Sequence, residues 1–380
     1  MSHWSDTMER RAFLQTGMVA GIAGATGFGS AASPLGAAPV RANAPLRLSS
    51  NENSLGLAPA ARRAVIDGIP EANRYPGAKR RELVAALATK HGVAPESIVI
   101  GCGSTEVLQV MVQANAARRG TLVTAYPTFE DVFDYGSPET YRVEKVPLGA
   151  NMAHDIDRMH ELAARSWDPV LVYICNPNNP TGTLTACSEV DAWIEDAPDN
   201  VRFMIDEAYF EYVDDAGYWS AIKWVEQRPN VVVARTFSKI YGMAGMRLGY
   251  GIAHPSTAAH IRRFMCQINA NELALRAALA SLQDNGLVGR SLDANTRAKQ
   301  ILYGCLEDLD LEYLTTQTNF VMHRINGDLQ TYRQRMQQYD VWVGRPFPPM
   351  LTYNRVSFGL PEEMERFADI LREFRAKGWV

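Results

Sequence analysis

Cysteine and histidine are both scarce in this sequence of 380 residues, and neither forms a cluster. The five cysteines stand far apart without a C-x-x-C pair, which argues against a zinc site and against a disulfide framework. The seven histidines are equally scattered, so we predict no metal site. An excess of one charge is lacking too, because 38 basic and 42 acidic residues give a formal net charge of −4. A polyanion-binding surface and a disordered acidic chain are therefore disfavoured.

Charged side chains are missing altogether from residues 12–40, which follow directly on Arg10 and Arg11. The stretch is long enough to span a bilayer, but its alanines, its glycines and Pro34 predict a weak helix. The segment MERRAFLQ resembles the twin-arginine export motif. We predict a twin-arginine-type signal peptide and linker over residues 1–44, transient contact with that translocation machinery, and a periplasmic protein. A flexible tail and an uncleaved membrane anchor are the alternatives, and a signal that does not function would leave the protein cytoplasmic.

Short β-branched runs alternate with amphipathic helical stretches after this leader. Near-continuous apolar runs of this length are typical of strands buried on both faces of a parallel sheet. The runs are ESIVIG, TLVTAY, YRVEKVPL, PVLVYIC, VRFMID, NVVVART and MRLGYGIA. From about residue 286 the pattern changes to a long helix, followed by the strands TNFVMHRI, VWVGRP and NRVSFG and two further helices. We predict an α/β fold with a large domain over 76–285, a small α+β domain over 286–380, and a segment 45–75 that packs with the small domain.

Polar residues follow the predicted strands, and ligands of open α/β sheets bind beyond the carboxyl ends of strands. A glycine-rich turn, GCGSTE, opens a helix after ESIVI, and its free N–H groups suit a phosphate. The turn NPNNPTG after PVLVYIC presents amide side chains, while Asp206 and Lys239 follow two later strands. Taken singly, these could be a connecting turn, a helix cap and a surface lysine. Together, a phosphate cradle, an acid, an amide, a phenol, a lysine and an arginine are what a phosphorylated pyridine aldehyde requires.

Several of these motifs resemble those of the fold-type I pyridoxal-phosphate (PLP) aminotransferases: NNPTG, DEAY, and a Ser-Lys pair followed eight residues after the lysine by Arg247. Within that group the chain resembles the histidinol-phosphate aminotransferase branch, from about residue 46 to the C-terminus. The supporting motifs are LSSNENSLGLAP, NRYPG, GCGSTE, YPTF, RTFSKIYGMAGMRLGYGIA, TNFV and NRVSFG. The resemblance implies PLP as cofactor, a mostly parallel seven-stranded sheet, a small-molecule amino donor with a 2-oxo acid as substrates, and a homodimer.

The resemblance also implies a role for each matching residue. Lys239 would form the Schiff base with the cofactor, because only a primary amine makes an exchangeable one. Asp206 would pair with the ring nitrogen, and Tyr209 and Asn179 would hydrogen-bond the phenolic oxygen. The other implied cofactor contacts are Gly103, Ser104, Thr105, Phe129, Thr236, Ser238, Arg247 and, from the neighbouring subunit, Tyr75. The implied substrate-binding residues are Arg355 and Asn51, with Arg345 as an alternative anion-binding group.

Other functions stay open at this point. A decarboxylase branch that acts on phosphorylated amino acids shares most of these motifs. Ser54 departs from the family, which often has proline after the NEN triplet. Histidinol-phosphate transamination in histidine biosynthesis is expected only if the predicted leader is wrong, because that pathway is cytosolic. A nicotinamide-dependent dehydrogenase is disfavoured because no complete G-x-G-x-x-G follows a strand. The presence of the lysine, aspartate and arginine together disfavours a non-catalytic binding protein.

Overall fold

The computed structural model describes residues 44–116, 118–136 and 141–380, all within one compact unit of the chain. The predicted signal peptide and linker lie outside the described residues, apart from Ala44. No helix in the described ranges combines the length and the apolar character that crossing a membrane requires.

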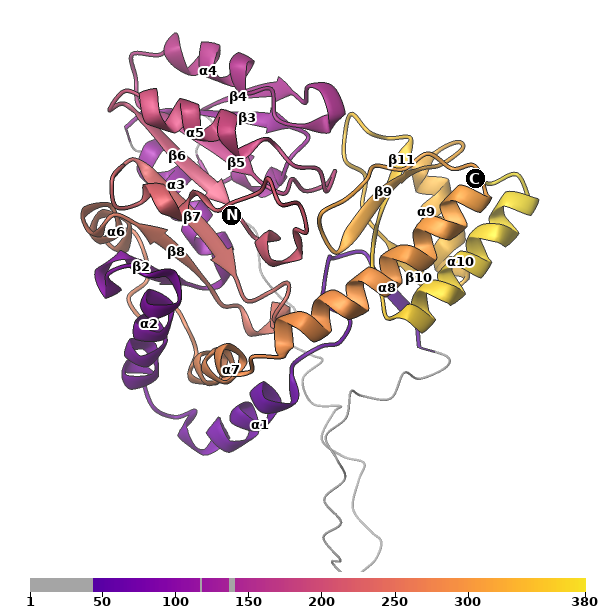
Figure 1. Ribbon diagram of the computed structural model, residues 1–380, viewed down its shortest axis with the longest axis horizontal. Helices are drawn as coiled ribbons and strands as arrows, with labels where there is room; N and C mark the ends of the chain where they lie inside the picture. The colour runs from indigo at the N-terminus through magenta and orange to yellow at the C-terminus, as the bar shows by residue number, and fades with distance from the viewer. Residues whose placement is uncertain (1–43, 117, 137–140) are drawn as a thin grey trace, which may run out of the picture. The chain divides into compact units, whose positions relative to one another are not determined.

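A seven-stranded sheet forms the centre of the larger part of the molecule (Figure 1). Its strand order is β2-β8-β7-β6-β5-β3-β4. β8 runs antiparallel to both neighbours, and all other adjacent pairs are parallel. The strands are β2 (Ile98–Gly101), β3 (Thr121–Tyr126), β4 (Arg142–Pro147), β5 (Val170–Cys175), β6 (Val201–Asp206), β7 (Val231–Thr236) and β8 (Gly249–Ala253). The predicted, mostly parallel sheet is confirmed, strand by strand.

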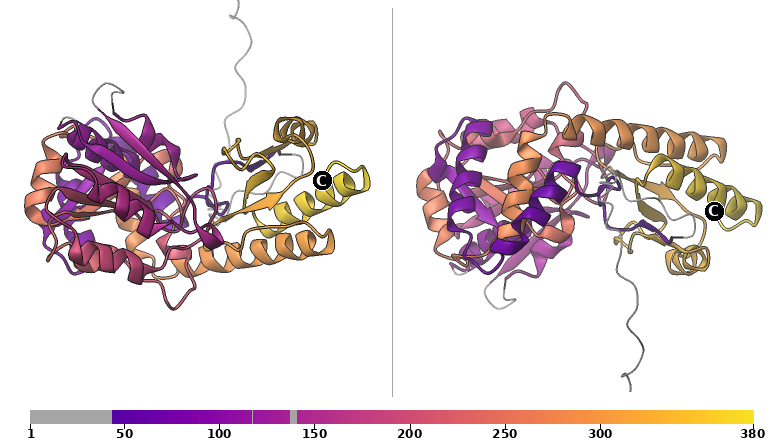
Figure 2. Two further views of the ribbon diagram at one scale, coloured as in Figure 1. Left: turned by 90° about the horizontal axis from the view of Figure 1, so that it is seen from above. Right: turned by 90° about the horizontal axis from the view of Figure 1, so that it is seen from below.

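Helices cover both faces of this sheet, because alternate side chains of its strands are apolar on both sides. In β5, Val172 and Ile174 join one core while Leu171 and Tyr173 join another. The first core includes side chains of α2 (Gly77–His91), α4 (Ile156–Ala164), α5 (Cys187–Asp196) and α7 (Glu272–Gln283). The second core includes side chains of α3 (Gly103–Ala116) and α6 (Pro255–Arg262). The two views of Figure 2 show the same layering.

The C-terminal part has a third core, built around two pairs of strands. β9 (Phe320–Arg324) pairs antiparallel with β11 (Tyr353–Ser357), and β1 (Leu46–Leu48) pairs parallel with β10 (Val341–Val343). α9 (Leu329–Gln338) and α10 (Pro361–Ala376) pack on them. The long helix α8 (Leu287–Asp308) begins with Leu287 in the first core and contributes Leu302 to this one. α8 therefore links the two parts of the chain (Figure 1).

The segment 45–75 contacts both parts. β1 adds to the C-terminal part through β10, whereas α1 (Pro59–Gly68) packs against α7 beneath the large sheet. The predicted packing of this segment with the small domain thus describes its beginning and not α1. The domain boundaries themselves stay a prediction.

Short 3₁₀ turns occur at Ile69–Glu71, Pro95–Ser97, Glu130–Phe133, Ala150–Met152, Phe210–Tyr212, Ala221–Trp224 and Ala244–Met246.

Candidate active site

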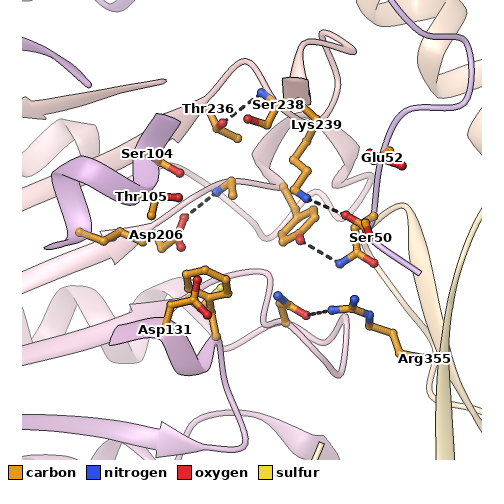
Figure 3. Close-up of a pocket in the computed structure, with 18 of the residues that line it drawn as sticks. Ser50, Glu52, Ser104, Thr105, Asp131, Asp206, Thr236, Ser238, Lys239 and Arg355 are labelled. Carbon is orange, nitrogen blue, oxygen red and sulfur yellow. Dashed lines mark hydrogen bonds between the residues drawn. The ribbon is translucent and has the colours of Figure 1, made fainter. Parts of the chain in front are cut away.

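A pocket of about 350 Å³ lies at the carboxyl ends of β5, β6 and β7. Strand register places two lining residues side by side, because Cys175 of β5 is the cross-strand partner of Asp206 of β6. In Figure 3, Ser104, Thr105, Thr236 and Ser238 lie toward one end of the pocket and Arg355 lies at the other. The predicted site residues that line it are Asn51, Ser104, Thr105, Phe129, Asn179, Asp206, Tyr209, Thr236, Ser238, Lys239, Arg247 and Arg355.

Lys239 follows β7 and projects its amine into the pocket. Its Nζ donates a hydrogen bond to the carbonyl oxygen of Ser50 at 3.3 Å and lies 5.5 Å from the ring centroid of Tyr209. Burial lowers the pKa of Lys239 to about 8, with a further contribution from the positive charge of Arg355. A neutral amine is nucleophilic and can accept a proton, so near neutral pH this lysine is suited to act as a nucleophile and as a base.

Asp206 ends β6 and is almost fully buried. Its Oδ2 accepts a hydrogen bond from the hydroxyl of Tyr173 at 3.0 Å, and its Oδ1 accepts one from the backbone N–H of Ala208 at 3.1 Å. Burial raises the pKa of Asp206 to about 6, although these donors oppose the rise. A cationic N–H in the pocket beside this carboxylate would stabilise its ionised form. The site therefore suits a protonated ring nitrogen.

Hydrogen-bond donors gather where α3 begins. Ser104 and Thr105 open that helix, and Thr236, Ser238 and Arg247 line the pocket opposite them. Gly103 does not line the pocket, but its φ is +74° and a Cβ there would lie 2.6 Å from Nη2 of Arg247. Glycine is required so that the guanidinium can approach the helix start. Hydroxyls, a helix N-terminus and a guanidinium together form a cradle for a phosphate dianion.

Tyr209 and Asn51 join the pocket to strand β11. The side-chain amide of Asn51 donates to the Tyr209 hydroxyl oxygen at 3.0 Å, and Ser357 Oγ donates to Asn51 Oδ1 at 3.0 Å. Asn51 has a positive φ of 55°, a conformation that asparagine tolerates better than most residues. This arrangement fixes the phenol relative to the C-terminal part of the molecule.

Arg355 lies on β11 and is buried. Its Nη1 donates to Asn179 Oδ1 at 2.6 Å and its Nη2 donates to the carbonyl oxygen of Ser49 at 2.7 Å. Within the described residues its Nε–H has no hydrogen-bond partner. Burial lowers the pKa of Arg355 to about 10, so it still carries its positive charge at neutral pH. A buried cation that touches only neutral groups is suited to bind an anion.

Tyr75 lies away from this pocket. The residue is 85% exposed and does not line the cavity. Within a single chain, Tyr75 is therefore not part of the site. Other residues line the pocket although no sequence motif indicates them: Ser50, Glu52, Leu108, Asp131, Cys175, Ala208, Ala244 and Phe347. The strand-end criterion could have found Cys175, which ends β5. Asp131 and Phe347 lie in connections, where no local pattern marks a residue as part of a site.

Comparisons with known proteins identify the family. Residues 44–371 match the family described as aminotransferase class I and II. The chain is 36% identical over 333 residues to a histidinol-phosphate aminotransferase of Moorella thermoacetica, covering 87% of this chain and 86% of that protein. The crystal structure of a putative histidinol-phosphate aminotransferase from Erwinia carotovora atroseptica matches with a TM-score of 0.86 at 38% identity, covering 88% of this chain and 97% of that one. The histidinol-phosphate aminotransferase of Sinorhizobium meliloti, solved in complex with pyridoxal-5'-phosphate, matches with a TM-score of 0.81 at 26% identity, covering 88% and 91%.

The chain therefore belongs to the aminotransferase class I and II family. Its fold is that of the fold-type I aminotransferases, and it is a transaminase whose cofactor is PLP, as the sequence motifs predict.

Proposed function

We propose that this PLP-dependent transaminase moves an amino group from a small-molecule donor to a 2-oxo acid, with Lys239 as the reactive amine. The observation that carries the proposal is an amine of lowered pKa in one pocket with a buried acid and a buried arginine. PLP supplies an aldehyde that combines with primary amines and a ring that withdraws electrons from the donor's α-carbon.

The side chains of the pocket fit the parts of this cofactor. The cradle at the start of α3 suits the phosphate, and Asp206 suits the ring nitrogen. Tyr209 and Asn179 offer a hydroxyl and an amide to the phenolic oxygen, and the ring of Phe129 offers an apolar face for stacking. Each polar group of the cofactor therefore has a partner of complementary chemistry.

Lys239 would have two tasks in this reaction. Its neutral amine would hold the cofactor, and when free its Nζ would act as the base that accepts the proton released from the donor's α-carbon. Arg355 would hold the substrate's anion meanwhile. Its planar guanidinium suits a carboxylate and a phosphate equally, so Arg355 alone does not distinguish an amino acid from an amino-alcohol phosphate.

Borohydride reduction tests the role of Lys239. We expect the purified, cofactor-loaded chain to be yellow, and reduction followed by peptide mapping to place the cofactor on Lys239. Lys239→Ala should abolish transamination while the cofactor still binds weakly. A label on another lysine would contradict the proposal, and carbon dioxide release without consumption of a 2-oxo acid would indicate a decarboxylase.

We also propose that the enzyme works as a homodimer in which Tyr75 reaches the phosphate cradle of the neighbouring subunit. The exposure of Tyr75 supports this, as does the exposure of Ile66 and Ile69 in the same segment, because exposed large apolar side chains suit a subunit interface.

The remaining proposal is export by the twin-arginine route to the periplasm. Arg10 and Arg11 before an uncharged run support it, and a protein that must acquire a cytosolic cofactor benefits from folding before export. Replacing both arginines with lysine should leave active, unprocessed enzyme in the cytoplasm, whereas the parent should appear in the periplasm shortened by roughly 30–45 residues. Normal export of the double variant would refute this proposal. If the parent instead stays in the cytoplasm at full length, the predicted leader is wrong, and histidinol phosphate, the substrate in the relatives' name, would be the preferred donor.

A further inference from the structure

A second arginine at the Arg355 end of the pocket, Arg345, is paired with a carboxylate. Arg345 follows β10, and Glu130 begins the turn Glu130–Phe133 after β3. Arg345 lines the pocket, and its Nη1 lies 2.6 Å from Oε2 of Glu130. The side chain of Glu130 is 22% exposed and that of Arg345 is 47% exposed. This partly exposed ion pair therefore connects the segment after β10 with the turn after β3, whose residues Phe129 and Asp131 line the pocket.

The two arginines at this end of the pocket, Arg345 and Arg355, differ in their partners. The guanidinium carbons of Arg345 and Arg355 lie 4.3 Å and 4.6 Å from the centroid of the Phe347 ring, so both groups belong to one end of the pocket. Within the described residues, Arg355 pairs with uncharged oxygens, whereas Arg345 pairs with Glu130. A further carboxylate, Asp131, lines the same pocket. One positive charge is thus available to a substrate and the other is neutralised.

We infer that Glu130 keeps Arg345 occupied and thereby restricts the site to donors and acceptors that carry a single anionic group. The inference rests on the proposed transaminase function and names the substrate class of that site. A second anion on the substrate, carboxylate or phosphate, would have to displace Glu130 from Arg345 and then lie near Glu130 and Asp131. An amino acid with an uncharged or cationic side chain meets no such repulsion, nor does a monocarboxylic 2-oxo acid.

Succinate and butyrate test this directly, because they have the same carbon chain and differ by one carboxylate. We expect calorimetry on the cofactor-loaded parent to show weaker binding of succinate than of butyrate. Glu130→Gln should raise the preference for succinate about fivefold, the upper range for releasing one solvent-accessible ion pair. Adding Arg345→Gln to that variant should reverse the gain, since the freed arginine would then be gone.

Glu161→Gln is the matched control, because Glu161 pairs with Arg158 on α4 and does not line the pocket. An unchanged preference in Glu130→Gln, an equal rise in Glu161→Gln, or a gain that survives removal of Arg345 would each overturn the inference. If Glu130→Gln does not fold, Glu130→Ala is measured in its place, with the same expected rise in the preference for succinate.

Transamination rates of the same variants give a second test of the inference. The ratio of kcat/KM for 2-oxoglutarate to that for pyruvate should be low in the parent and rise in Glu130→Gln. A parent that transaminates no donor would refute the proposed function, whereas the preference between succinate and butyrate would still decide the inference.

Discussion

The lowered pKa of Lys239 is caused by its burial and by charged residues that are distant from it in sequence. Burial is the main cause that lowers its pKa, Arg355 and Arg247 add to the effect, and Glu52 and Asp206 oppose it. At pH 7 an amine with a pKa of about 8 is neutral in roughly 9% of molecules, against roughly 0.03% for an ordinary lysine. The sequence could identify Lys239, Asp206 and Asn179 because each follows a strand. It could not identify the charges that set the pKa of Lys239.

The first prediction concerns pH. The rate at which cofactor-free protein combines with PLP should rise with pH and level off above about 8, because only the neutral Lys239 amine reacts. Since Arg355 lowers this pKa, Arg355→Gln should move the midpoint to higher pH. Stopped-flow absorbance measures the rate, with Arg158→Gln on exposed α4 as the control. A parent midpoint near that of free lysine would contradict the assignment.

The second prediction concerns the grip on the substrate. In Arg355→Lys, a single ammonium group replaces a fork that contacts Asn179 and Ser49 at once, so substrate binding should weaken by about 2–5 kcal/mol. The absorbance of the bound cofactor should change little, because the cradle at α3 is distant from this substitution. Titration of substrate into the loaded protein measures the effect. Normal affinity would mean that another group binds the anion.

At the scale of elements, the start of β8 packs against the start of α3 and thereby positions the phosphate cradle. Gly249 begins β8 opposite Gly101 of β2, next to the backbone where α3 starts. The sequence predicts β8 because its apolar run is local. By contrast, the three-residue strand β1 is too short to show a pattern, and its pairing with β10 joins residues almost 300 positions apart. α1 is a similar case, since nothing local indicates that it packs on α7.

The third prediction follows from this close approach. A Cβ on Gly249 would lie 2.2 Å from the backbone nitrogen of Ser104, so the backbone must shift. We expect Gly249→Ala to destabilise the fold by about 1–3 kcal/mol and to weaken PLP binding, because the start of α3 moves. Thermal unfolding and PLP titration measure the two effects. Gly304→Ala on α8, where a Cβ would meet nothing within 4 Å, should not destabilise the protein. Equal behaviour of both variants would count against this account of the cradle.

At the scale of the whole molecule, the site lies where two separately built cores meet. The large sheet supplies Asp206, the turn after β7 supplies Lys239, β11 supplies Arg355, and the segment at Asn51 connects the two parts. Each core could be predicted from the sequence, because the apolar patterns of its strands and helices are local. The ion pair of Glu130 and Arg345 depends on how the two parts meet, and no pattern in either segment predicts it.

The last prediction extends the site to a second subunit. If Tyr75 acts in its neighbour's cradle, Tyr75→Ala and Lys239→Ala should each inactivate a homodimer but complement each other. In a hybrid, the subunit that retains Lys239 receives Tyr75 from its partner, so one of the two sites is intact. Random reassortment at equal amounts makes half the dimers hybrid and should restore about a quarter of the parent activity. Lys239→Ala mixed with Asp206→Asn is the control, because both residues line the pocket of their own chain and every hybrid site keeps one defect. Activity in that control, none in the Tyr75 mixture, or a fully active monomer in sedimentation would rule out a shared site.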